Sequence, residues 1–126
     1  MKNGISEKHI SNGFIGGICM EQMCIIVEGR TDKERLNKIV ARNVHIVCTN
    51  GTKDEEALID LVEPYEDSVL FTFFDRDKSG NYLRKQMQRV YSEALQLQLP
   101  APYIEVAETP VAILKPILKA AKIDLK

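Results

Sequence analysis

The sequence lacks a long apolar run. Its apolar stretches fall well short of the roughly 18–20 residues that span a bilayer, and its N-terminus has no continuous apolar segment typical of secretory signals. We therefore expect a cytoplasmic protein with no membrane partner. Histidine is also scarce, because His9 and His45 are the only two, which argues against a histidine-based metal site.

Cysteine pairs and an excess of one charge are missing as well. The cysteines at positions 19, 24 and 48 are odd in number and have no C-x-x-C spacing, so we expect no disulfide partner and no zinc knuckle. Lys and Arg total 17 against 18 Asp and Glu, giving a formal net charge of -1. Any surface that binds nucleic acid must therefore be a local patch.

The 126 residues allow one domain with a modest core. Residues 1–22 hold four of the seven glycines and show no sustained period of 2 or 3.6, so we interpret them as a poorly ordered N-terminal arm. Residues 23–126 alternate between short apolar runs and amphipathic segments. We expect this part to be the folded domain, with the arm dispensable for its stability.

The alternation predicts four strand–helix units in series. Two helices are expected to begin at S/T-x-x-E capping boxes, at Thr31 and Thr52, and a last one at Thr109. The third helix is expected over residues 82–97. The expected strands cover residues 24–27, 44–48, 68–74 and 103–106.

Such units imply right-handed crossovers and a parallel sheet covered on both faces. The expected fold class is therefore α/β: a doubly wound, Rossmann-like, four-stranded parallel sheet sandwiched by helices. In these folds ligands bind outside the carboxyl ends of the strands, where the strand order reverses.

Three acidic residues follow two of the expected strands. Glu28 ends the first, and Asp75 and Asp77 follow the third, so a flavodoxin-like strand order brings all three together. Clustered carboxylates repel one another unless a cation neutralises them. Hard oxygen ligands favour Mg²⁺, for which Mn²⁺ can substitute. The alternative for each residue alone is a solvated loop position or, for Asp77, the cap of the next helix; the set together favours a site.

At these residues the sequence resembles the Toprim domains shared by topoisomerases, bacterial primases, old-family nucleases and recombination-repair proteins. IIVEGRTD, with Glu28, Gly29 and Asp32, is similar to their first motif. FFDRDKSG, with Asp75, Asp77 and Gly80, is similar to their second. Small stand-alone bacterial Toprim proteins are the nearest likeness.

The resemblance implies a Mg²⁺ site held by Asp75 and Asp77. Glu28 would be a further ligand or the general acid/base for phosphodiester cleavage or nucleotidyl transfer. Gly29 and Gly80 would allow close backbone approach. Asn81 stands where topoisomerase-like members often carry an acid, and their nucleophilic tyrosine belongs to another domain. Neither topoisomerase nor complete primase activity is expected.

Positive charge lies close to the carboxylates. Between residues 75 and 89 five cations oppose two acids, and we expect a nucleic-acid phosphate to be bound there. DNA and RNA fit equally well. The residues expected to bind it are Arg76, Lys78, Arg84 and Lys85.

Two other functions stay open at this point. One is a non-catalytic module that uses metal and cations to dock nucleic acid or a protein partner. The other is a metal-free receiver or flavodoxin-like domain, which also places acids at strand ends. Glu28-Gly29 followed by the Asp75/Asp77 pair disfavours the second. The interpretation is a Mg²⁺-dependent protein that acts on nucleic acid, as a nuclease or by nucleotidyl transfer.

Overall fold

The computed structural model describes residues 14–15 and 18–126 of the chain. A short antiparallel pair, β1 (Phe14–Ile15) and β2 (Ile18–Cys19), precedes a four-stranded parallel sheet. The strand order in this sheet is β4-β3-β5-β6. Its strands are β3 (Met23–Val27), β4 (Val44–Cys48), β5 (Val69–Phe73) and β6 (Leu95–Leu97).

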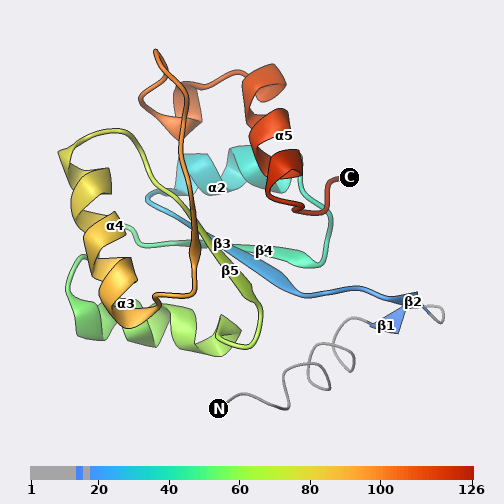
Figure 1. Ribbon diagram of the computed structural model, residues 1–126, viewed down its shortest axis with the longest axis horizontal. Coiled ribbons are helices and arrows are strands. Elements are labelled where there is room, and N and C mark those ends of the chain that lie inside the picture. Colours follow the sequence, from blue (N-terminus) through green and yellow to red (C-terminus); the bar gives the residue numbers. More distant parts are fainter. Residues whose placement is uncertain (1–13, 16–17) are drawn as a thin grey trace.

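Helices cover both faces of this sheet (Figure 1). One face carries α2 (Arg30–Asn37) and α5 (Val111–Ala120), and the other carries α3 (Glu55–Val62) and α4 (Lys78–Val90). Two short 3₁₀ helices complete the fold, η1 (Glu63–Tyr65) and η2 (Val106–Glu108). Within the described residues, no helix is both long and apolar enough to cross a membrane. The expected doubly wound α/β class is confirmed.

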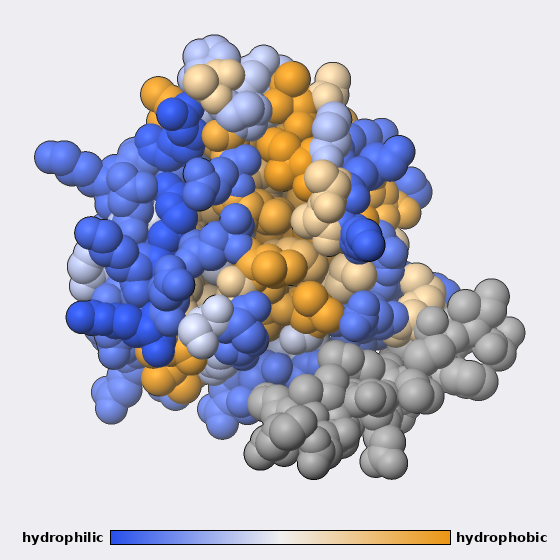
Figure 2. All heavy atoms as spheres, in the orientation of Figure 1, coloured by the Kyte–Doolittle hydropathy of each residue, from blue (hydrophilic) through white to orange (hydrophobic). Residues whose placement is uncertain are grey.

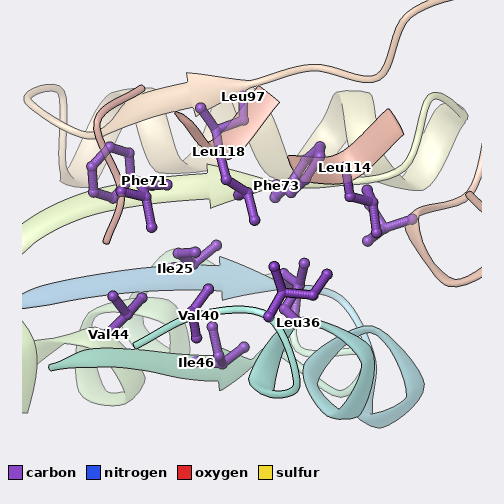
Figure 3. Close-up of a cluster of buried hydrophobic side chains, with 14 of the residues drawn as sticks. Ile25, Leu36, Val40, Val44, Ile46, Phe71, Phe73, Leu97, Leu114 and Leu118 are labelled. Atoms are coloured by element: carbon purple, nitrogen blue, oxygen red, sulfur yellow. The ribbon is translucent and has the colours of Figure 1, made fainter. Parts of the chain in front are cut away.

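The core lies in two layers because every residue of β3 is buried and alternate residues face opposite sides. Ile25 packs with Leu36 of α2 and Leu114 of α5 in one layer, shown in Figure 3. Ile26 packs with Leu58 of α3 in the other. Burying each such side chain stabilises the fold by roughly 1.5–3 kcal/mol before the entropy cost of ordering. Packing on both faces of the sheet holds the two central strands, β3 and β5, in position.

The fourth strand differs from the prediction. We expected a helix through residue 97 and a strand at 103–106, whereas α4 ends at Val90 and β6 is Leu95–Leu97. Residues 103 and 104 instead bind the loop after β5: the Arg76 N–H donates to the Ile104 carbonyl at 2.7 Å. The apolar spacing beyond Val90 suggested a helix, but it belongs to a turn followed by a short edge strand.

The edge formed by β6 is partly apolar at the surface. Figure 2 shows a band of hydrophobic residues down the middle of one face of the molecule. Leu95 and Ile104 are 54% and 53% exposed. This strand has a single neighbour, β5, in the described sheet, which explains why its sequence lacks the continuous apolar run of β3 and β5.

The helix starts also differ from the predicted capping boxes. The N-caps are Gly29 for α2, Asp54 for α3 and Pro110 for α5, rather than Thr31, Thr52 and Thr109. Asp54 accepts a hydrogen bond from the Ala57 N–H at 2.9 Å. In α2 the Asp32 side chain instead accepts from the Gly29 N–H at 3.1 Å, and α5 has no side-chain cap.

The predicted N-terminal arm, residues 1–22, falls largely outside the described residues. Within the described part, the Gln22 carbonyl accepts a hydrogen bond from the Val69 N–H at 3.0 Å, and the Glu21 carbonyl accepts one from the Asn43 side chain. The chain is therefore bonded to the domain from residue 21 onward. That the arm is poorly ordered remains a prediction.

Candidate functional site

The candidate site lies at the carboxyl ends of β3 and β5. These neighbours pair in parallel from Met23↔Val69 to Ile26↔Thr72. From β3, the sheet extends to β4 on one side and to β5 and then β6 on the other. The topological switch point therefore lies between β3 and β5. The expected strand order is confirmed, and it brings Glu28 and Asp75 into contact.

Glu28 joins the ends of the two strands. One of its carboxylate oxygens accepts a hydrogen bond from the Asp75 N–H at 2.8 Å, and the other accepts one from the Ser79 hydroxyl at 3.2 Å. Partial burial raises the pKa of Glu28, the charges of Asp75 and Asp77 raise it further, and its two hydrogen bonds oppose the shift. Glu28 is therefore suited to hold a proton.

Asp75 connects the site to η2. Its Oδ1 accepts a hydrogen bond from the Val106 N–H at 2.9 Å. Burial raises the pKa of Asp75 and the charge of Asp77 adds to this, whereas the Val106 bond and Arg84 lower it. The second carboxylate oxygen of Asp75 has no hydrogen-bond partner among the described residues and could ligate a cation.

Asp77 is the N-cap of α4, as one of the alternatives anticipated. Its Oδ1 accepts a hydrogen bond from the Gly80 N–H at 2.8 Å. Because α4 begins at Lys78 rather than at residue 82, Asp77 and Ser79 both lie at the strand end. The cap orients Asp77 while its side chain stays exposed.

Gly80 is required by close packing. A Cβ at this position would lie 1.9 Å from the Asp75 carbonyl oxygen, so the first turn of α4 contacts the backbone of the site directly. Gly29 differs, because its φ of −134° suits any residue and a Cβ there would lie 3.8 Å from Asp32. The expectation of close backbone approach fits Gly80; this structure shows no such need at Gly29.

Asp32 is a member of the site that the sequence analysis did not select. It is only 6% exposed, and its Oδ2 accepts a hydrogen bond from the Gly29 N–H at 3.1 Å. Burial raises the pKa of Asp32 to about 6, with contributions from the charges of Asp75 and Glu28, while hydrogen bonds from the Gly29 and Ala107 N–H groups lower it. Its position within the first motif was the available signal.

The four cations expected to bind phosphate differ in exposure and in hydrogen-bond partners. Lys78 and Lys85 are exposed on α4. Arg76 donates to the Tyr103 carbonyl at 3.0 Å. Arg84 donates to the carbonyls of Phe74 and Asp75 and to Asn81, so it also supports the backbone of the site. A pocket of about 300 Å³ is lined by Arg76, Asn81, Arg84 and Gln98.

The carboxylates suit a hard cation that keeps much of its water. Among the described residues, no group of three or more His, Cys, Asp or Glu side chains is arranged so that it alone could hold a metal ion. Glu28, Asp75 and Asp77 are nevertheless close enough for their charges to raise pKa values within the set. Mg²⁺ is commonly held by one or two carboxylates plus waters and a substrate phosphate, which fits this donor set.

Comparisons with known proteins agree with this fold. No family model matches the chain. The chain is 35% identical over 101 residues to the uncharacterized protein YusF of Bacillus subtilis (strain 168), a match that covers 80% of this chain and 69% of YusF. It is also similar to the solved structure of a small TOPRIM domain protein from Bacillus stearothermophilus, with a TM-score of 0.78 and 36% identity. That match covers 85% of this chain and 91% of the other.

Proposed function

Since the chain belongs to the small Toprim-domain proteins, we propose that it is a Mg²⁺-dependent protein that cleaves or transfers phosphodiester linkages of nucleic acid. The observation that carries the proposal is the hydrogen bond from the Asp75 backbone N–H to the Glu28 carboxylate, which links the ends of β3 and β5 across the switch point. Burial, and after it the charges of the neighbouring carboxylates, raise the pKa of both side chains, and such shifts are common at functional sites.

Asp75 and Asp77 are the residues proposed to hold the metal, with Glu28 beside them. Each of the two aspartates uses Oδ1 for a backbone hydrogen bond, which fixes its orientation. When bound, Mg²⁺ or Mn²⁺ would supply stabilisation of the charge on the phosphate oxygens during an in-line displacement.

Glu28 is the proposed general acid/base. The Asp75 N–H and the Ser79 hydroxyl keep its two oxygens in place, and partial burial raises its pKa, which favours proton exchange by this carboxyl group. Arg76 and Arg84 are proposed to orient the phosphate backbone from the neighbouring pocket.

A second candidate is a non-catalytic module that binds metal and phosphate to dock nucleic acid or a protein partner. The hydrogen bonds already made by Asp75, Asp77 and Glu28 favour it, because each carboxylate also has a role within the fold. Binding occurs under both candidates, whereas turnover occurs only under the first.

Turnover therefore tests the proposal. We would incubate the full chain with end-labelled single- and double-stranded DNA and RNA, with Mg²⁺, with Mn²⁺ and with a chelator. The proposal predicts a metal-dependent change in fragment length that Glu28→Gln lowers by at least about a hundredfold. Glu56→Gln, on the exposed surface of α3, is the matched control and should retain full activity. Absence of turnover with all substrates, together with intact binding, would favour the docking module.

A further inference from the structure

A second polar pocket lies at the carboxyl end of β4, on the other side of the carboxylates from Arg76 and Arg84. Its volume is about 390 Å³. We infer that it binds the backbone phosphate next to the one at the carboxylates, on the same nucleic-acid strand; this rests on the proposed function. The residues that line the pocket are Arg30, Lys33, Glu34, Asn37, Cys48 and Asn50.

Residues at the end of β4, beside the pocket, form hydrogen bonds with the backbone of Glu28. The Asn50 N–H donates to the Glu28 carbonyl at 2.9 Å, and the Thr49 hydroxyl donates to the same oxygen at 3.3 Å. Asn50 and Gly51 adopt positive φ values of 51° and 87°, which make a tight turn at the end of β4. One wall of the pocket is therefore hydrogen-bonded to the backbone of Glu28.

The other wall supplies positive charge. Arg30 is exposed and Lys33 is half-buried, both on α2, and neither forms an ion pair with another described residue. Glu34 lies in the same pocket and weakens its charge, but the two cations outnumber it. A guanidinium fork beside an ammonium and an amide side chain is a donor set that fits phosphate oxygens.

The strand order places the acidic residues between two cationic pockets. Across the sheet, the Arg30 pocket is at the end of β4, Glu28 and Asp75 are at the ends of β3 and β5, and the Arg76 pocket includes Gln98 just after β6. Neighbouring strands are about 4.8 Å apart, so β4 and β6 are separated by roughly 14 Å. A single strand of nucleic acid lying along the carboxyl ends of the β-strands would place successive phosphates at the Arg30 pocket, at the carboxylates and at the Arg76 pocket.

Binding of short oligonucleotides tests the inference. The probes are 5′-labelled eight-nucleotide oligothymidylate and oligouridylate, with Ca²⁺ replacing Mg²⁺, followed by fluorescence anisotropy at several salt concentrations. Arg30→Ala and Lys33→Ala should each weaken binding about tenfold and reduce the slope of log K against log salt by about 0.7. Glu34→Gln should strengthen binding severalfold. Lys38→Ala, an exposed position at the far end of α2, is the control and should bind as wild type.

The outcomes separate this inference from the proposed function. Failure of the wild type to bind either probe would overturn both. Wild-type binding that is unaffected in the Arg30, Lys33 and Glu34 variants would overturn the phosphate pocket alone, as would an equal loss in Lys38→Ala. Reduced binding in Arg30→Ala and Lys33→Ala with unchanged Mg²⁺ affinity by calorimetry would support the pocket as a separate subsite.

Discussion

Among single residues, Gly80 has the least freedom to change. Helix propensity alone would favour alanine in α4 by about 1 kcal/mol. A Cβ would however lie 1.9 Å from the Asp75 carbonyl oxygen, so we expect Gly80→Ala to lower the free energy of unfolding by about 2–4 kcal/mol. Gly29→Ala should cost no more than about 1 kcal/mol. Urea denaturation of both variants measures the difference, and equal small effects would contradict the close packing of α4 on the site.

Buried carboxyl groups make stability depend on pH. Burial raises the pKa of Asp32 to about 6 and also raises the pKa of Glu28 and Asp75, so these groups bind protons more tightly in the folded chain than in the unfolded one. The stability gained by protonation is complete below the ordinary pKa of an aspartate and is lost as pH rises through about 6. Without metal, we therefore expect the free energy of unfolding to increase as pH falls from 7.5 to 5, by roughly 1.4 kcal/mol for Asp32.

Asp32→Asn isolates the contribution of that residue. The variant should show a smaller change in unfolding free energy between pH 7.5 and pH 5 than wild type, whatever its absolute stability. Denaturation midpoints across this pH range provide the measurement, with Glu56→Gln as a control for removal of an exposed charge. A variant that keeps the full wild-type slope would refute the assignment to Asp32.

At the scale of elements, Asp77 couples the start of α4 to the site. Its Oδ1 accepts the Gly80 N–H, and asparagine caps helices about as well as aspartate. Without metal, Asp77→Ala should therefore lose about 1 kcal/mol of stability and Asp77→Asn almost none. Thermal melts of the two variants in chelator compare them directly; equal destabilisation would mean that charge, rather than the cap, is what Asp77 contributes to the fold.

Elements with a strong local signal could be predicted, and those set by tertiary contacts could not. β3, β4 and β5 are largely apolar runs, and their predicted positions hold to within a residue. β6 is three residues with an exposed Leu95, and it was missed because an edge strand needs little apolar sequence. The helix starts were misjudged because two threonines matched the capping pattern while Gly29 and Asp54 occupied the turn positions.

The same division holds within the site. Glu28 and Asp75 were predictable because each follows a buried strand, and the parallel sheet aligns the strand ends. Asp32 stands in the first motif but was not selected as a site residue, because its burial and its contact with η2 depend on the tertiary fold: N–H groups of η2 reach Asp75 and Asp32 from a distant part of the chain. Arg84 was expected only to contact phosphate, but its bonds to Phe74 and Asp75 also make it a support for the strand end.

At the scale of the whole molecule, the domain is expected to stand without its first residues. The backbone is bonded to the sheet from Glu21 and Gln22 onward. Deletion of residues 1–19 should therefore change the melting temperature by less than about 5 °C. Differential scanning calorimetry compares the truncated and full chains, and a larger drop would mean that the N-terminal residues contribute to the folded domain.

The central claim is that Glu28, Asp75 and Asp77 form one metal site at the switch point of the sheet. The most direct test is calorimetric titration of Mg²⁺ into the wild type and Asp77→Asn, because this substitution keeps the cap of α4 and removes only a charge. The account predicts wild-type binding that raises the melting temperature, and loss of both effects in the variant. Equal binding by the two proteins, or binding by neither, would contradict it.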